Sequence, residues 1–246
     1  MSSVSTAVIL AAGMGTRLKA RGTEAPKGFL TLGSKPIIQE SVSRQESAGI
    51  EKIYIVTGHL SHFYDELADS SQGRICTVKN EQYAESGSMF SLAKLRGKLD
   101  SPFLLLESDL IYETRALETL LEDPRPDVML ASGFTGSRDE VWTWTDEKGN
   151  LTGLSKNKND KPEPPAGELV GISKISPDFF AVMLEEADKA FQMSLKLEYE
   201  TCMAAAARRI PMAVNVVPDL LWAEIDDEDH LERARSSVYP KIPKVN

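Results

Sequence analysis

The sequence predicts an α/β protein built on a mostly parallel sheet. Short runs of β-branched and aliphatic residues alternate with amphipathic segments through the first half of the chain, which is typical of βαβ units. The length of 246 residues suits one large domain with a buried core, and 41% hydrophobic with 26% charged residues is an ordinary globular composition. We therefore expect a single folded domain over residues 1–246.

The first half of the chain contains the clearest elements. Pro36 suits a first helical turn, where its missing N–H costs nothing, and Gly49 suits the end of that helix. The apolar runs predict strands at residues 7–11, 52–57, 74–79, 103–107 and 128–132, and the amphipathic segments predict helices at residues 36–48, 60–68, 88–99 and 114–121.

Beyond Gly133 the pattern changes to shorter strands separated by turn residues, including a turn at residues 146–150. A polar, proline-rich stretch at residues 156–165 predicts a mobile loop. After it we expect strands at residues 168–173, 212–217 and 221–225, and helices at residues 177–190, 198–207 and 228–236.

Charge and composition exclude several classes of partner. A net charge of -9 argues against binding to nucleic acid or to a membrane surface, because both are polyanions that favour basic patches. No apolar run reaches the roughly 20 residues of a spanning helix, and no basic segment precedes the first apolar run. Cys76 and Cys202 form no C-x-x-C pair, so we expect neither a zinc site nor a disulfide framework, and a reducing, cytoplasmic location.

The string LAAGMGTRL lies where the first strand turns into a loop, and Pro26, Lys27 and Gly28 follow it. Its two glycines let backbone N–H groups approach a phosphate chain. Arg17 offers a fork of donors, and Lys27 offers a point charge for the α-phosphate. Leu18 stands where a dinucleotide fingerprint has its third glycine, so a nicotinamide site is rejected. The alternative is a tight turn with two solvated basic residues.

Two aspartates are candidate metal ligands. Asp109 follows the apolar run 103–107, at the carboxyl end of a central strand, where open sheets place their ligands. Asp226 ends the strand 221–225 on the same face as Trp222 and Glu224. Two carboxylates with phosphate oxygens and water suit Mg²⁺. The alternative is that each aspartate caps a turn or helix, although Asp227 is the better cap for the last helix.

The sequence resembles 2-aminoethylphosphonate cytidylyltransferases, which belong to the nucleotidyltransferases that activate sugars, choline phosphate and phosphonates. The resemblance rests on the string LAAGMGTRL and on five further strings: KNEQYAESGSM from Lys79, ESDLIYE from Glu107, LTGLSKN from Leu151, GELVGISK from Gly167 and WAEIDDEDHLE from Trp222. The resemblance covers residues 7–239. It implies a Rossmann-like sheet with helices on both faces and a small α+β lobe. It divides the chain into a nucleotide-binding part (about 5–133), an acceptor-binding part (about 134–220) and a closing strand and helix (221–240).

The resemblance also implies roles for individual residues, with CTP and 2-aminoethylphosphonate as substrates, Mg²⁺ as cofactor and a homodimer as assembly. Arg17, Lys27 and Lys156 would be catalytic, and Asp109 and Asp226 would hold the metal. The nucleotide would contact Ala11, Ala12, Gly13, Gly15, Thr16, Arg17, Lys27, Asn80, Ser86, Gly87 and Ser88. The acceptor would contact Asp139, Glu140, Lys156, Glu168 and Glu198.

Non-functional roles for some of these residues remain as alternatives. The segment 79–89 could be an ordinary capping loop, and Lys156 could be a solvated lysine. Three rival functions also remain: a phosphocholine cytidylyltransferase, which would favour aromatic faces around a quaternary ammonium, a sugar-phosphate nucleotidyltransferase, and a non-catalytic nucleotide sensor.

Overall fold

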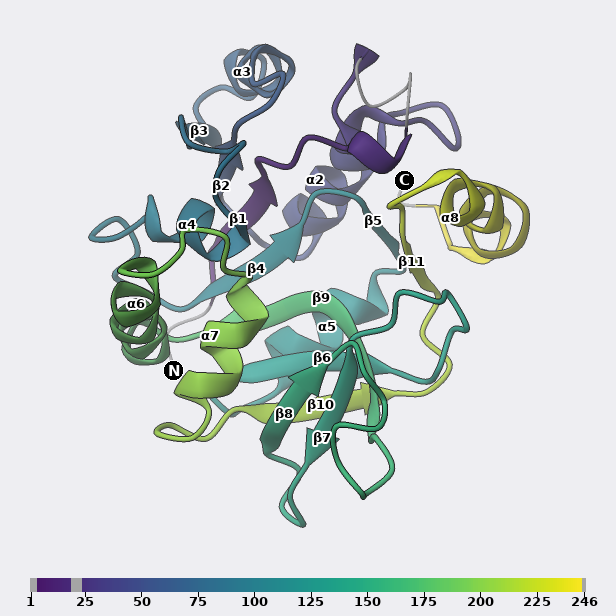
Figure 1. Cartoon of the computed structure of the whole chain (residues 1–246). Coiled ribbons are helices and arrows are strands. Elements are labelled where there is room, and N and C mark those ends of the chain that lie inside the picture. The colour runs from purple at the N-terminus through teal and green to yellow at the C-terminus, as the bar shows by residue number, and fades with distance from the viewer. Residues whose placement is uncertain (1–3, 19–23, 245–246) are drawn as a thin grey trace.

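The computed structural model describes residues 4–18 and 24–244 (Figure 1). A single large sheet crosses the molecule, with helices on both sides of it. Its strands are β1 (Thr6–Ala11), β2 (Lys52–Thr57), β3 (Ile75–Lys79), β4 (Phe103–Glu107), β6 (Val128–Ser132), β7 (Trp142–Thr145), β8 (Leu151–Ser155), β9 (Gly167–Ile175) and β10 (Ala213–Val217).

The sheet runs in the order β10-β6-β9-β4-β1-β2-β3, with β7 and β8 appended to β9. β1 pairs in parallel with both β2 and β4, β2 with β3, and β6 with β10. β9 is antiparallel to both of its neighbours, β4 and β6. The predicted α/β class with a mostly parallel sheet and helices on both faces is therefore confirmed.

Alternating side chains of the strands build a core on each face of the sheet. In β1, Val8 and Leu10 belong to one buried cluster, and Ala7, Ile9 and Ala11 belong to the other. The first cluster packs on α4 (Ser88–Ala93), α6 (Pro177–Phe191) and α7 (Tyr199–Ala206), and the second packs on α2 (Ile37–Ser47), α3 (His62–Asp69) and α5 (Arg115–Glu122).

A small second sheet pairs β5 (Leu110–Tyr112) with β11 (Trp222–Glu224) in antiparallel fashion. It brings together two segments far apart in the sequence, one just after β4 and one just before α8 (Glu228–Arg233). A π-helical segment at Ala234–Val238 and a short turn at Tyr239–Lys241 follow α8. Asp109 and Asp226 lie at the same end of this ribbon, since the Ile225 N–H donates to the Asp109 carbonyl.

Most predicted elements are present within a few residues of their expected bounds. Helix α2 begins after Pro36 and ends before Gly49, whose φ of 90° requires a residue without a side chain. The predicted helix at residues 88–99 is too long, because α4 ends at Ala93 and turns follow. Asp227 caps α8, as expected, by accepting from the His230 N–H at 2.8 Å.

Two other expectations concern the chain as a whole. None of the helices over residues 4–18 and 24–244 is long and apolar enough to span a bilayer. Cys76 and Cys202 are both free thiols, so the expected lack of a disulfide framework agrees with the structure.

Candidate active site

A cavity of about 540 Å³, called the large cavity, lies at the carboxyl ends of β1 and β4. The end of β1 contributes Ala11, and the loop that follows contributes Ala12, Gly13, Gly15, Thr16 and Arg17, all residues predicted to contact the nucleotide. Gly15 has a φ of 62°, which suits a residue without a side chain, and residues 12–17 around it all line the cavity. The sequence motif therefore forms a wall of this cavity.

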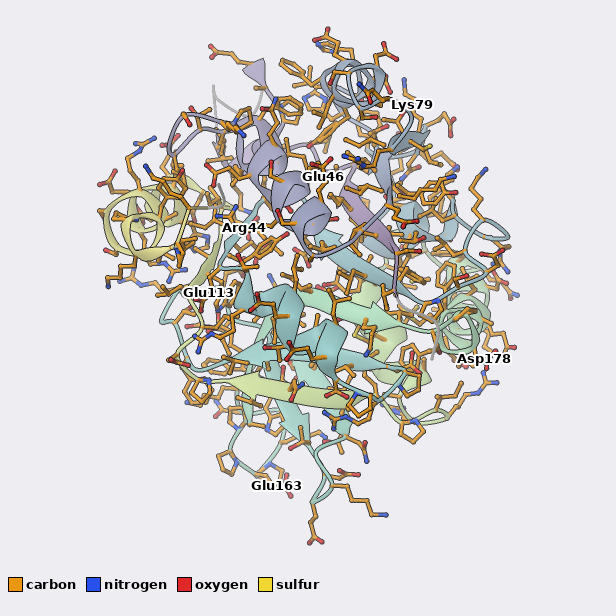
Figure 2. All side chains as sticks on the ribbon, turned by 180° about the vertical axis from the view of Figure 1, so that it is seen from behind. Arg44, Glu46, Lys79, Glu113, Glu163 and Asp178 are labelled. Carbon is orange, nitrogen blue, oxygen red and sulfur yellow. The ribbon has the colours of Figure 1, made fainter. Side chains whose placement is uncertain are left out.

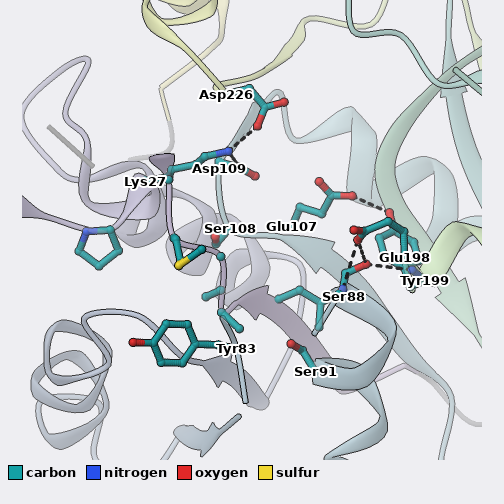
Figure 3. Close-up of a pocket in the computed structure, with 18 of the residues that line it drawn as sticks. Lys27, Tyr83, Ser88, Ser91, Glu107, Ser108, Asp109, Glu198, Tyr199 and Asp226 are labelled. Carbon is teal, nitrogen blue, oxygen red and sulfur yellow. Dashed lines mark hydrogen bonds and ion pairs between the residues drawn. The ribbon is translucent and has the colours of Figure 1, made fainter. Parts of the chain in front are cut away.

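Five charged side chains predicted to act in catalysis and metal binding belong to one ion-pair network, of which Figure 3 shows Lys27, Asp109 and Asp226. Lys27 Nζ contacts Asp109 Oδ2 at 2.8 Å and also contacts Asp226 Oδ1. Asp226 Oδ1 in turn lies 2.8 Å from an Arg17 nitrogen. These contacts join segments that are 199 residues apart, and they bring both candidate metal carboxylates to one ammonium group.

Asp139 extends the network to the second half of the chain. Its carboxylate lies 2.9 Å from Arg17 and 2.7 Å from Lys156 Nζ. Burial alone would raise the pKa of Asp139, but hydrogen bonds from Lys156 and Arg17 outweigh it and lower the pKa to about 2. Lys156 is therefore anchored over the large cavity and paired with the acid predicted to contact the acceptor.

The protonation state of Lys27 follows from its surroundings. Burial would lower the pKa of the ammonium group, but the charges of Asp109 and Asp226 outweigh that effect and raise the pKa above its ordinary 10.5. Lys27 is thus held as a cation between two carboxylates.

The loop between β3 and α4 forms the opposite wall, with Ser86, Gly87 and Ser88 lining the cavity. Asn80, also predicted to contact the nucleotide, lies behind this wall and is fully buried. Its amide donates to Ser86 Oγ at 2.9 Å and to Ser91 Oγ at 3.0 Å. In this structure Asn80 fixes the loop from behind.

The second half of the chain holds the same loop in place. The Gly87 N–H donates to the Leu195 carbonyl at 2.8 Å, and the Met89 N–H donates to the Leu197 carbonyl at 2.9 Å. Glu198 lines the cavity and accepts from Ser88 Oγ at 2.6 Å. The carboxylate of Glu198, which was predicted to contact the acceptor, therefore hydrogen-bonds to this loop in the structure described.

Gly87 tests this packing. A Cβ at Gly87 would lie 2.4 Å from the Leu197 carbonyl oxygen, a backbone atom that cannot swing away. We expect Gly87→Ala to lower the free energy of unfolding by about 1–3 kcal/mol, as overpacking does. Urea unfolding measures this change, and Gly13→Ala is the control because a Cβ there meets nothing within 4 Å. Equal stability of the two variants would contradict the close packing.

A smaller cavity of about 60 Å³, called the small cavity, lies beside the large one. The two share Glu107, Lys156, Glu200 and Glu224 as lining residues. Asp139 and Glu168, predicted to contact the acceptor, line the small cavity, whereas Glu140, predicted with them, lines neither cavity. Glu168 accepts from the Thr135 N–H at 2.8 Å, so it also shapes the wall.

Glu107 and Glu224 are the main residues missing from the sequence-based site. Ligand oxygens of Glu107, Asp109 and Glu224 lie within 4.8 Å of one another, close enough to hold one cation. Burial and the neighbouring carboxylates raise the pKa of both glutamates well above the ordinary range. The signal was present, because each glutamate precedes its aspartate by two residues and period-2 alternation places both on one face.

Glu200 is the third carboxylate between the cavities. Its Oε2 atom is buried and has no hydrogen-bond partner within the part of the chain that the structure describes. Burial raises the pKa of Glu200 from 4.5 to about 7. An unpaired carboxyl at this depth is costly when ionised, so the site favours a bound cation or a proton.

This burial predicts a pH-dependent stability. Between about pH 4.5 and about pH 7 the folded protein holds a proton on Glu200 that the unfolded chain releases, so stability falls as pH rises through this window. Glu200→Gln lacks this slope. Relative to the parent, the variant should gain up to about 3 kcal/mol across the window. Urea unfolding at about pH 5 and about pH 8 measures this gain, and a pH-independent difference would contradict it.

The fold is that of α/β nucleotidyltransferases with a Rossmann-like sheet. The inositol-1-phosphate CTP transferase from T. maritima superposes with a TM-score of 0.81 at 15% identity, covering 98% of this chain and 99% of that one. The phosphocholine cytidylyltransferase LicC from Streptococcus pneumoniae superposes with a TM-score of 0.78 at 20% identity, covering 95% and 98%.

The chain belongs to the family described as the MobA-like NTP transferase domain, whose model matches residues 7–160. It is 26% identical over 230 residues to the CMP-5'-(3-aminopropyl)phosphonate synthase of Streptomyces rubellomurinus, covering 90% of this chain but only 37% of that protein. It is also 26% identical over 176 residues to the 2-aminoethylphosphonate cytidylyltransferase of Lancefieldella rimae, covering 70% and 68%. The predicted membership of the nucleotidyltransferases is confirmed.

Proposed function

We propose that this protein transfers CMP from CTP to 2-aminoethylphosphonate, releasing pyrophosphate. The family and fold support nucleotidyl transfer. Two similar proteins have names that join CMP or a cytidylyl group to an aminoalkylphosphonate. The reaction is an in-line attack by a phosphonate oxygen on the α-phosphorus. Because a phosphonate is largely ionised near neutrality, catalysis needs positioning and charge stabilisation rather than a dedicated base.

The ion-pair network provides the positive charge for this reaction. Arg17 and Lys27 lie at the glycine loop that would cradle the triphosphate, and Lys156 reaches the same cavity from the second half of the chain. In the absence of substrate their charges are balanced by Asp109, Asp139 and Asp226. A bound nucleotide would compete for these cations, so its phosphates would replace the carboxylates as partners.

The donor set also fits Mg²⁺. Asp109 and Asp226 contact the same Lys27 nitrogen, so their oxygens converge on one point, and hard carboxylate oxygens are the ligands that Mg²⁺ prefers. We propose that Asp109 and Asp226 hold Mg²⁺, with Glu224 beside them. The ion would neutralise charge on the α-phosphate, and Lys27 would be freed from the carboxylates to bind phosphate oxygen.

The observation that favours a primary ammonium on the acceptor is the buried, unpaired Glu200 Oε2 beside Glu107 and Glu224. A primary ammonium has three N–H donors to offer these acids, whereas a quaternary ammonium has none. Tyr199 already donates its hydroxyl to Glu107 at 2.7 Å. The wall therefore suits 2-aminoethylphosphonate better than phosphocholine.

Pyrophosphate release with Mg²⁺ tests this proposal. CTP should be tried with 2-aminoethylphosphonate, phosphoethanolamine, phosphocholine and glucose-1-phosphate, and ATP, UTP and GTP serve as nucleotide controls. We expect the highest kcat/KM with CTP and 2-aminoethylphosphonate, and a larger KM increase for this acceptor than for phosphocholine in Glu200→Gln. Preference for phosphocholine would overturn the acceptor, and no release with any pair would overturn the enzyme.

A further inference from the structure

A third cavity, of about 550 Å³, lies apart from the site described above and shares no lining residue with the other two. It is bounded by the loop at residues 32–35, by α2, and by the segment at residues 235–244. Its volume matches that of the large cavity, so it has room for a molecule of nucleotide size. We call it the basic cavity.

Its lining is positively charged in a protein of net charge -9. Lys35, Arg44, Arg235 and Lys244 line it against a single acid, Glu40. Over residues 4–18 and 24–244, Lys35 and Lys244 make no ion pair, and the ion pair between Arg235 and Glu232 is long, at 3.9 Å. Like charges gathered around one hollow repel each other unless an anion occupies it.

Arg44 is the buried member of this group, on the side of α2 that faces α8 (Figure 2). Only 5% of Arg44 is exposed, and its Nε has no partner among the described residues. One terminal nitrogen donates to the Glu40 carbonyl at 3.1 Å, and the guanidinium lies 5.9 Å from the centre of the Tyr112 ring. A buried guanidinium with an unused donor is costly unless a ligand or water completes it.

Glu40 offsets only one of these four positive charges, and both of its carboxylate oxygens are already engaged. One accepts from the Tyr239 hydroxyl at 2.6 Å, and the other lies 3.4 Å from Arg44. The Tyr239 hydroxyl also packs against Gly33, where a Cβ would lie only 2.1 Å away. The floor of the cavity is thus a fixed arrangement of Glu40, Arg44 and Tyr239.

The approach to the cavity contains a π-helical segment at Ala234–Val238, which supplies Arg235 and leads into Tyr239. Such segments are uncommon and are frequent at functional sites. Leu32, Pro240 and Ile242 add apolar surface to the same cavity. The basic cavity therefore combines positive charge, which would bind a phosphate, with apolar surface, which would contact a base or ribose.

We propose that the basic cavity is a second binding site, for a phosphate-bearing anion of nucleotide size. Lys35, Arg235 and Lys244 would bind the phosphate, and Arg44 would complete the site from below. The proposal does not depend on cytidylyl transfer, because none of these residues lines the large or the small cavity.

Backbone amide chemical shifts can distinguish the two sites in one titration. CMP, pyrophosphate and inorganic phosphate should be added separately to the ¹⁵N-labelled protein, with Gly33 and Ser34 reporting on the basic cavity and Gly13 and Gly15 on the large one. We expect CMP to shift the Gly33 and Ser34 signals and to bind there more tightly than inorganic phosphate.

Variants assign the response to the cavity. Lys35→Gln and Arg235→Gln should each weaken CMP binding at Gly33 and Ser34 by about tenfold, the value of one charge-assisted hydrogen bond, and leave the Gly13 and Gly15 responses unchanged. Lys98→Gln, at an exposed lysine that lines none of the three cavities, should change neither response. The proposal would be overturned if CMP left the Gly33 and Ser34 signals unmoved, or if CMP and inorganic phosphate bound there with equal affinity. It would also be overturned if both variants bound CMP at this cavity with the parental affinity.

Discussion

Lys27→Ala is expected to lower kcat by about a hundred- to a thousandfold, the loss typical of removing a positioned charge from a phosphoryl-transfer site. Lys27 is the cation that contacts both Asp109 and Asp226 beside the glycine loop. Steady-state pyrophosphate release measures the change. Lys94→Ala is the control, because Lys94 pairs with the exposed Glu81 and lines none of the three cavities described here.

The same variant separates catalysis from metal binding. Without Lys27, the carboxylates of Asp109 and Asp226 lose the cation that balances them. We therefore expect Lys27→Ala to bind Mn²⁺, a spectroscopic substitute for Mg²⁺, more tightly than the parent in the absence of nucleotide, although it turns over slowly. Parental turnover, or weaker Mn²⁺ binding, would show that Lys27 does not have the role proposed here.

Asp226→Asn should have the second large effect. It removes a candidate metal ligand and also the carboxylate that joins Arg17 to Lys27. We expect activity to fall about a hundredfold or more and Mn²⁺ affinity, followed by electron paramagnetic resonance, to fall with it.

Asp227→Asn provides a matched control one residue away. Asp227 caps α8 and lines none of the three cavities, and asparagine is also a good helix cap, so this variant should retain parental activity and metal affinity. If the two variants lost activity equally, the loss would reflect disruption of this turn rather than loss of a ligand.

The sequence predicts the strands of the nucleotide half well, because buried parallel strands are continuous apolar runs that glycine and polar residues interrupt. It also places Asp109 and Asp226 at strand ends and Arg17 and Lys27 in the segment that follows the first strand, and the structure brings these four residues together. The antiparallel direction of β9 was not predictable, because hydrophobic pattern carries no information about strand direction.

Long-range pairing explains the remaining differences in the site. The commitment of Glu198 to Ser88 and the burial of Asn80 behind the loop depend on packing between segments up to 110 residues apart. Composition at either segment gives no sign of such contacts. Glu107 and Glu224, in contrast, could have been found by applying to each aspartate the same alternation that placed Asp226.

The position of β9 has a consequence for synthesis of the chain. Within the part of the chain that the structure describes, β6 pairs only with β9 and β10, and one edge of β4 pairs only with β9. Both strands therefore wait for residues made later. The span matched by the family model ends at residue 160, before either partner exists. A nascent chain of that length would expose two apolar strand edges, a state prone to aggregation, and would rely on rapid completion or on chaperones until residues 167–175 emerge from the ribosome.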